Sequence, residues 1–111
     1  MIRYPSGEIV LVHYPFTGNG RYKLRPGLVI LDTGDDDCMV AKITSREQSS
    51  TYDVALLEWR QDGLIKPSIV RLHKLHTLEK TAIVKTLGRL VANDRQTVSA
   101  ALLKIFSEWQ S

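Results

Sequence analysis

The chain has 111 residues, of which 43% are hydrophobic and 24% are charged, and its formal net charge is +3 with a pI near 9.2. These values are typical of one globular domain, expected over residues 1–111, and exclude a chain that is disordered over most of its length. There is no run of about 18 apolar residues and no signal peptide, and the single cysteine, Cys38, excludes an internal disulfide and a cysteine-rich zinc site. We therefore expect a cytoplasmic protein with no membrane contact. Because a chain this short buries a smaller share of its surface than a large one, we also expect a stabilising dimer.

The charges are distributed unevenly along the chain. Residues 1–31 have a balance of +3, residues 32–63 hold eight acidic against three basic residues, and residues 64–92 hold six basic residues against one acidic residue. If the fold brings the two basic segments together, they form a surface that attracts phosphate. Charges scattered over a solvated surface are the alternative.

Most of the chain predicts short strands separated by turns. Glycines and an asparagine indicate a loop over residues 16–23, TGDDD indicates a turn within 32–37, and the polar residues 45–52 indicate another loop. Short strands with no long helix between them indicate a mainly β fold, a compact barrel or sandwich. Val- and Ile-rich segments bounded by turn residues predict strands at 7–14, 28–31, 38–44, 54–57 and 68–72.

The end of the chain changes to a helical period. Asn93 followed by Gln96 fits an N-cap with a capping box, so a helix is expected over residues 93–109. This helix is expected to pack on the sheet through one apolar stripe, formed by Val98, Ala101, Leu102, Ile105 and Trp109.

Familiar catalytic motifs are missing from the sequence. There is no P-loop, GxSxG, HExxH or GxGxxG pattern. His73 and His76 are three residues apart in a predicted strand, so they would point to opposite faces and would not hold one ion. We expect no metal and no cofactor. His13, beside the 16–23 loop, is a candidate ligand contact, with a structural or merely exposed histidine as the alternative.

One segment resembles a known family. GEIVLVHYPFTGNGRYKLRPGLVI resembles the opening of the PemK/MazF toxins, in which a strand ending in an aromatic-Pro-Phe segment leads into a loop, then K-x-RP and a hydrophobic strand. The resemblance continues with ITS after the third strand and with GLIKPSIVRLHKLHTLEKTAIVKTLGRL, and spans roughly residues 6–92.

The resemblance implies an SH3-like small β-barrel over residues 6–92 followed by the C-terminal helix. It also implies the toxin of a type II toxin–antitoxin system: a homodimeric, metal-independent endoribonuclease (an mRNA interferase) that cuts single-stranded messenger RNA at selected sequences. A cognate antitoxin would place a disordered segment in the RNA site.

The resemblance also implies the site residues. The arginine of the family's RP motif corresponds to Arg25 and the threonine of its ITS-type motif to Thr44, so these are the expected catalytic residues. Their chemistry suits that role, since an arginine offers rigidly arranged donors to phosphate and a threonine offers a hydroxyl without added charge. Pro26 restricts Arg25 to extended backbone conformations. Lys23 and Ser45, close to Arg25 and Thr44 in the sequence, are expected to contact RNA. The chemistry and position of Arg21, Tyr22 and His13, rather than the resemblance, add these three as expected RNA contacts, with Tyr22 as the preferred stacking residue for a base.

Two other functions remain open from the sequence. Some toxins on this barrel act as gyrase poisons through a terminal tryptophan, and Trp109 invites that comparison, although it continues the apolar stripe of the predicted helix. A non-catalytic SH3-like module that binds nucleic acid or protein is the second alternative.

Overall fold

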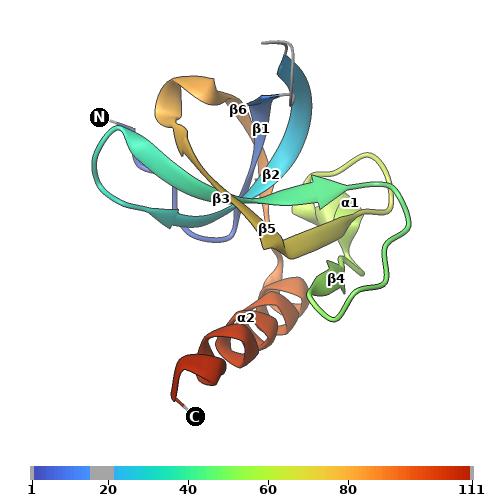
Figure 1. Cartoon of the computed structure of the whole chain (residues 1–111). Coiled ribbons are helices and arrows are strands. Elements are labelled where there is room, and N and C mark those ends of the chain that lie inside the picture. The colour runs from blue at the N-terminus through green and yellow to red at the C-terminus, as the bar shows by residue number, and fades with distance from the viewer. Residues whose placement is uncertain (1, 16–21, 111) are drawn as a thin grey trace.

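The computed structural model describes residues 2–15 and 22–110 (Figure 1). Six antiparallel strands form one curved sheet in the order β4-β5-β3-β2-β1-β6. The predicted mainly β class with a C-terminal helix is confirmed, although β4 and β6 remain the two edges of an open sheet. The elements are β1 (Glu8–Pro15), β2 (Tyr22–Asp32), β3 (Asp37–Thr44), β4 (Asp53–Ala55), α1 (Trp59–Asp62), β5 (Ile69–Glu79), a 3-10 turn (Lys80–Ala82), β6 (Ile83–Arg89), α2 (Ala92–Ser107) and a second 3-10 turn (Glu108–Gln110).

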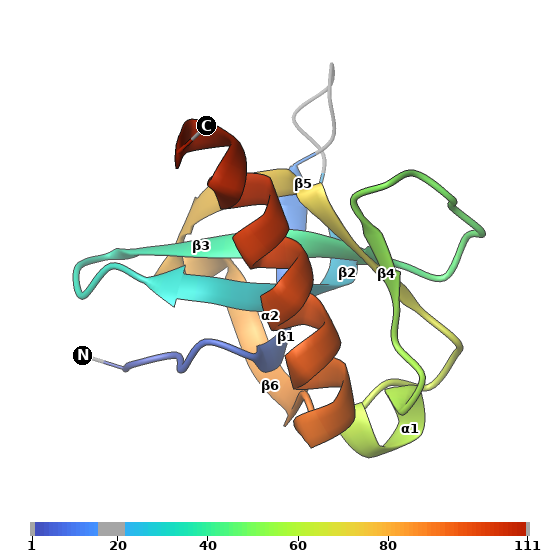
Figure 2. The same ribbon diagram turned by 90° about the horizontal axis from the view of Figure 1, so that it is seen from below.

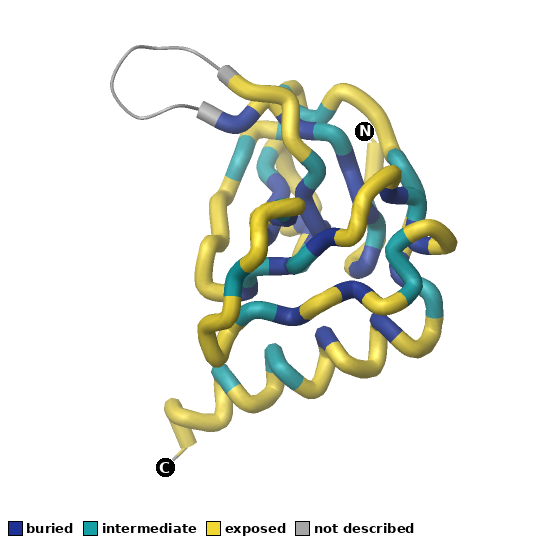
Figure 3. Tube along the Cα trace, turned by 90° about the vertical axis from the view of Figure 1, so that its right-hand side faces the viewer, coloured by how far each residue is buried: buried dark blue, intermediate teal, exposed yellow. Residues whose placement is uncertain are grey.

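Two apolar clusters lie on the two faces of this sheet, because alternate side chains of a strand point to opposite faces. One cluster contains Val10, Val12, Val29 and Val40, and the 3-10 turn at Lys80–Ala82 contributes to it. The other lies between the sheet and α2, which crosses the sheet with its buried residues facing inward (Figures 2 and 3). This second cluster contains Ile9, Leu28, Ala41, Ile43, Val54, Leu56, Leu64, Val70, Leu72, Leu90 and Val98.

Strand β2 begins at Tyr22, well before the strand predicted at 28–31. It pairs with β1 without interruption, so the tertiary partner overrides the local turn signals. Pro26 is tolerated inside β2 because the ladder with β3 ends at Gly27, and no described strand on that side requires the N–H that proline lacks.

The later strands also differ from the prediction. Strand β4 is shorter than the predicted 54–57, and the sequence patterns do not predict β6. Strand β5 extends to Glu79 and contains a bulge, because Ala41 pairs with Leu75 while the next residue, Lys42, pairs with Arg71. Residues 72–74 therefore lie outside the ladder with β3. A bulge bends a strand and redirects its side chains.

Two glycines explain the close approach of α1 to β6. Gly63 ends α1 with a φ of 105°, which favours glycine, and a Cβ there would collide with the Leu87 carbonyl oxygen. A Cβ at Gly88 would collide with the Asp62 carbonyl oxygen. The GL segment at residues 63–64 and the LGRL segment at residues 87–90 therefore lie in contact, although they are far apart in the sequence.

Helix α2 begins at Ala92, so the predicted N-cap at Asn93 is wrong. Val91 occupies the N-cap position and offers no side-chain cap. Its N–H donates to Asp62 Oδ1 at 2.8 Å. The Asp62 side chain of α1 thus satisfies a group that a local cap would otherwise serve, and no local pattern could reveal it.

Two buried carboxyl groups, Asp62 and Asp94, join α1 to α2. Asp94 accepts hydrogen bonds from the N–H groups of Leu57 at 3.0 Å and Glu58 at 2.9 Å. Burial and the neighbouring Asp94 raise the pKa of Asp62 to about 7. Oδ2 of Asp62 is buried and receives no N–H or O–H from a described residue. A proton on Asp62, donated to Asp94, satisfies both groups.

The apolar stripe of α2 contacts the sheet only as far as Ile105. Val98 is buried, and Ala101 and Leu102 are partly buried against the cluster beneath the helix. Trp109 lies beyond the end of α2 in the 3-10 turn, with 90% of its surface exposed. The prediction that it continues the packed stripe is wrong, because the helix ends at Ser107 and the tighter turn changes the register.

Candidate functional site

Arg25 and Thr44 lie on the same face of the sheet, near the ends of neighbouring strands. The ladder between β2 and β3 ends where Gly27 pairs with Lys42. Arg25 precedes Gly27 by two residues and Thr44 follows Lys42 by two, so all four share one face. The paired part of β2 and β3 stops at Gly27 and Lys42, so Arg25 and Thr44 both lie just beyond it, on that one face.

The polar groups of these two side chains are available to a ligand. The Arg25 side chain is exposed, and its Nη1 donates to the neighbouring Leu24 carbonyl oxygen at 2.9 Å. No carboxylate among the described residues forms an ion pair with Arg25. Thr44 is half-buried, and its Oγ1 accepts the N–H of Arg46 at 3.1 Å. This contact positions the hydroxyl oxygen and leaves its proton to donate to an anion.

A row of charged side chains crosses three strands beside this pair. Lys42 on β3 lies opposite Gly27 on one side and opposite Arg71 on the other, and Arg71 lies opposite Asp53 of β4. Nε of Arg71 donates to Asp53 Oδ1 at 2.9 Å. Burial alone would raise the pKa of Asp53, but hydrogen bonds from Arg71 and Ser50 outweigh it and hold the pKa below its usual value. The Asp53 side chain is therefore a charged carboxylate, and it forms an ion pair with Arg71.

Gly27 makes room on this face for the Tyr14 side chain. A Cβ at Gly27 would lie 2.9 Å from the Tyr14 hydroxyl oxygen. That oxygen is buried and has no hydrogen-bond partner among the described residues, and burial raises the pKa of Tyr14. The His76 ring packs edge to face on Tyr14 with the centroids 5.4 Å apart. The Tyr14–His76 pair therefore packs beside Gly27 on the face that carries Arg25, and the Tyr14 phenol stays protonated.

Two of the predicted RNA contacts lie near the pair. Lys23 is exposed on β2, and alternation along the strand gives it the same face as Arg25. Ser45 is exposed directly after β3 and lines a depression of about 400 Å³ together with Trp59.

His13 is not brought together with Arg25. It pairs with Leu24, so its side chain occupies the opposite face of the sheet. Arg21 lies outside the described residues, as does the side chain of Tyr22.

Lys42 and Arg71, which the structure places beside the pair, are not among the residues predicted from the sequence. A signal was present for Lys42, because it precedes Thr44 by two residues in a strand and must share its face. For Arg71 there was none, because the register between β3 and β5 depends on the bulge at 72–74.

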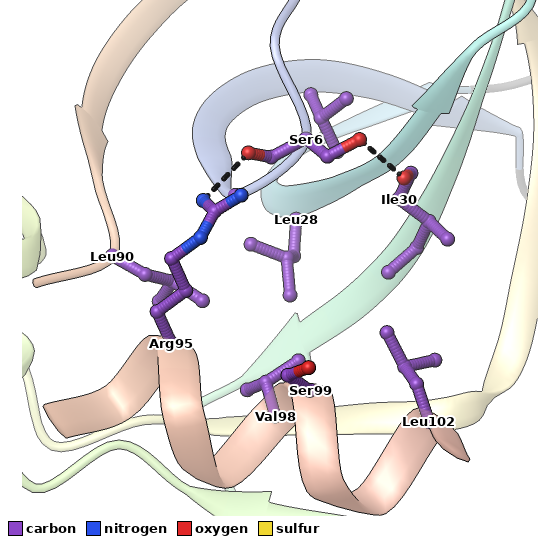
Figure 4. A pocket seen from close by; sticks show the side chains of 10 residues that line it. Ser6, Leu28, Ile30, Leu90, Arg95, Val98, Ser99 and Leu102 are labelled. Atoms are coloured by element: carbon purple, nitrogen blue, oxygen red, sulfur yellow. Dashed lines mark hydrogen bonds between the residues drawn. The ribbon is translucent and has the colours of Figure 1, made fainter. Parts of the chain in front are cut away.

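The other face of the sheet has a cavity of about 200 Å³ beneath α2 (Figure 4). Nη1 of Arg95 donates to the Ser6 carbonyl oxygen at 2.8 Å, and Ser6 Oγ donates to the Ile30 carbonyl oxygen at 2.7 Å. Apart from these partnered groups and Ser99, the side chains labelled around the cavity in Figure 4 are apolar: Leu28, Ile30, Leu90, Val98 and Leu102. This cavity offers no acid–base pair and is separate from Arg25.

Within residues 2–15 and 22–110, no three His, Cys, Asp or Glu side chains gather in a way that would hold a metal ion. No helix in the described part of the chain is long and apolar enough to cross a membrane.

Comparison with known proteins gives one family and one fold. The family described as PemK-like, MazF-like toxin of type II toxin-antitoxin system matches residues 6–106. No curated protein matches the sequence.

Solved structures share the fold at low sequence identity. An endoribonuclease in complex with its cognate antitoxin, from a mycobacterial species, is 16% identical and has a TM-score of 0.76, with 95% of this chain and 96% of that chain covered. The Mycobacterium tuberculosis toxin MazF-mt6 is 20% identical with a TM-score of 0.71, covering 90% and 96%. A MazE–MazF structure from Deinococcus radiodurans is 18% identical with a TM-score of 0.71, covering 92% and 94%.

Proposed function

Since the chain belongs to the PemK-like, MazF-like toxins of type II toxin–antitoxin systems, we propose that it is an endoribonuclease that cuts single-stranded messenger RNA at selected sequences without a metal ion. The observation that carries this proposal is the placement of Arg25 and Thr44 on one face, at the end of the β2–β3 ladder. The cations Lys42 and Arg71 border them, and Asp53 pairs with Arg71.

The reaction needs groups of this kind. In metal-free cleavage, the 2′-hydroxyl attacks the adjacent phosphorus while the bond to the 5′-oxygen of the next nucleotide breaks. The products are a 2′,3′-cyclic phosphate and a 5′-hydroxyl, a base takes the 2′-hydroxyl proton, and an acid protonates the leaving oxygen. Negative charge grows on the non-bridging oxygens in the transition state.

Arg25 and Thr44 would stabilise that charge. The guanidinium presents fixed N–H donors and stays charged at any working pH. The Thr44 hydroxyl, held at its oxygen by the Arg46 N–H, would donate to the same phosphate. Removal of one such donor costs about 10²–10³ in rate.

The expected partners follow from the same family. Among structures of this fold, one is of an endoribonuclease with its cognate antitoxin. We propose that a cognate antitoxin of this chain competes with RNA for the basic face in the cytoplasm. The expected homodimer would cover part of α2, where Leu103 and Phe106 are 70% and 54% exposed.

A gyrase poison is the second candidate function. The exposure of Trp109 at 90% favours it, because the side chain is available to a partner. The basic face around Arg25 has no part in that function.

One experiment separates the candidates. The purified protein is incubated with a long RNA in EDTA and, in parallel, with gyrase and relaxed plasmid. Cuts at a repeated short sequence in EDTA support the endoribonuclease. Inhibited supercoiling with intact RNA supports the gyrase poison, and RNA binding without cuts supports a non-catalytic module.

A further inference from the structure

We propose that the buried pair of Asp62 and Asp94 is a pH-sensitive latch between α1 and α2. While the two carboxyl groups share one proton, they hold the starts of both helices in place. Loss of that proton loosens the junction, so that residues 56–58 and the first turn of α2 open locally while the sheet stays folded. This device goes beyond the proposed cleavage of RNA and does not depend on it.

The first observation is that the pair accepts the hydrogen bonds of both helix starts. Asp94, in the first turn of α2, accepts the N–H groups of Leu57 and Glu58, which lead into α1. Asp62, at the end of α1, accepts the N–H of Val91, which leads into α2. Neither Glu58 nor Val91 makes a side-chain cap of its own, so each helix caps the other. A change at this one pair therefore acts on both helices.

The second observation is that both carboxyl groups are buried without a cation. Asp62 is 0% exposed and Asp94 is 1% exposed. No basic side chain in the described part of the chain forms an ion pair with either of them. Two charged carboxylates in such a position repel each other and lack water, and one shared proton removes most of that penalty.

The charged groups that act on Asp62 are acidic. Asp94 faces it from α2 and Glu58 faces it from the start of α1, and burial together with these two neighbours raises the pKa of Asp62 to about 7. Strand β6 packs against this turn through the backbone at Leu87 and Gly88. The proton on Asp62 therefore leaves near neutral pH.

The basic residues closest to the pair in the sequence are held elsewhere. The guanidinium of Arg60 lies over the Trp59 ring, 4.8 Å from its centroid. Nη1 of Arg95 donates to the Ser6 carbonyl oxygen at 2.8 Å. Neither of them compensates the second charge when the proton leaves.

The third observation is that the junction has few other supports. Helix α1 has four residues, which is too short to be stable alone. Leu57 is 79% exposed, and Ala92 and Asn93 at the start of α2 are also exposed. Segments with few buried apolar contacts open at a lower free energy than the whole domain.

The direction of the effect follows from proton release on opening. The closed junction keeps the proton up to about pH 7, whereas an aspartate in water has released it above its ordinary pKa of 3.8. The equilibrium constant for opening therefore rises about 10-fold per pH unit between pH 5 and 7 and levels off above that. Leu57 and Trp59 also line the depression that contains Ser45, so one wall of this depression loosens with the junction.

Native-state hydrogen exchange at pH 5, 6, 7 and 8, with increasing sub-denaturing urea, tests the latch. The amides of Leu57, Glu58 and Val91 report on the junction, and that of Val40, which is buried in β3, reports on global unfolding. After division by the intrinsic exchange rates, the opening constants at the junction should rise about 10-fold per pH unit up to pH 7. They should depend little on urea, because a local opening exposes little surface.

Two variants complete the test. Asp62→Asn is the matched control, because the amide can accept the Val91 N–H and donate to Asp94 without a titrating proton. Its junction should lose the rise between pH 5 and 7. Glu58→Gln removes one acidic neighbour, so it should lower the pKa of Asp62 and make the rise level off at a lower pH than in the wild type.

Two results would overturn the latch. If the junction amides exchange only through the urea-dependent unfolding that Val40 reports, the pair adds to global stability and no local opening exists. If the wild type and Asp62→Asn show the same dependence of opening on pH, the pair holds no titrating proton. Either result leaves the proposed RNA cleavage untouched, because that activity is measured separately.

Discussion

Replacing Asp62 with asparagine tests the buried carboxyl pair that joins α1 to α2. In the folded protein the pKa of Asp62 is about 7, raised first by burial and then by Asp94, against an ordinary value of 3.8 for an aspartic acid side chain. Between these values the folded state holds a proton that the unfolded state has released. The stabilisation is therefore complete below about pH 4 and is lost as the pH rises through 7.

The magnitude follows from the width of that interval. Each unit between the folded and unfolded pKa of Asp62 is worth about 1.4 kcal/mol of folding free energy. The half of the interval that lies next to the folded pKa therefore corresponds to roughly 2 kcal/mol. Asparagine can accept the Val91 N–H through its oxygen and donate its NH₂ to Asp94, as the protonated acid does. Asp62→Asn should therefore keep the contacts and lose the pH dependence.

Urea unfolding of both proteins at pH 5, 6, 7 and 8 provides the measurement. The wild-type free energy of unfolding should fall by roughly 2 kcal/mol across this series relative to Asp62→Asn. The three histidines are common to both proteins, so their titration cancels in the difference. Parallel curves would show that Asp62 carries no proton at pH 5, and the account of the pair would be wrong.

Further predictions address the face and the fold. Arg25→Ala should lower RNA cleavage by about 10²-fold or more, with an unchanged melting temperature; a folded variant that keeps more than a tenth of the rate removes Arg25 from the site. Thr44→Val should also reduce cleavage with little loss of stability, and an unchanged rate in the same assay would exclude Thr44. Tyr14→Phe should stabilise the protein by about 1 kcal/mol, because the hydroxyl is buried without a partner among the described residues; a lower urea midpoint would reveal a partner. Asp32→Asn should lower the melting temperature at pH 7, with a difference that shrinks below about pH 4, because N–H donors from Tyr4 and Gly34 and the ammonium of Lys80 hold the pKa of Asp32 below its usual value.

The sequence predicted the elements whose signals are local. The strands near β1 and β3 and the C-terminal helix follow from composition and periodicity, and these signals are confirmed. The start of β2 at Tyr22 and the length of β5 depend on pairing with other strands, which no window of the sequence contains. The start of α2 depends on Asp62, from another element, so the local cap signal at Asn93 was misleading.

The residues of the candidate site also separate into those with a local sequence signal and those that depend on strand pairing. Arg25 and Thr44 are predicted from a motif, and strand alternation around the β2–β3 ladder gives them one face of the sheet. Lys42 and Arg71 became visible only with the register, because the bulge in β5 decides which residue lies opposite Lys42. His13 precedes the loop that leads to Arg25, but closeness in the sequence does not bring the two side chains together, because strand alternation directs His13 to the other face of the sheet.

The most direct test of the central claim is a single deoxy substitution. A cut position is first mapped on a short RNA in EDTA, and the nucleotide 5′ of the cut is then replaced by its 2′-deoxy form. If the 2′-hydroxyl is the nucleophile at Arg25 and Thr44, the substitution abolishes that cut, and the unsubstituted RNA gives a 2′,3′-cyclic phosphate and a 5′-hydroxyl by mass spectrometry. Cleavage of the deoxy-substituted strand at the same position would contradict the proposed mechanism.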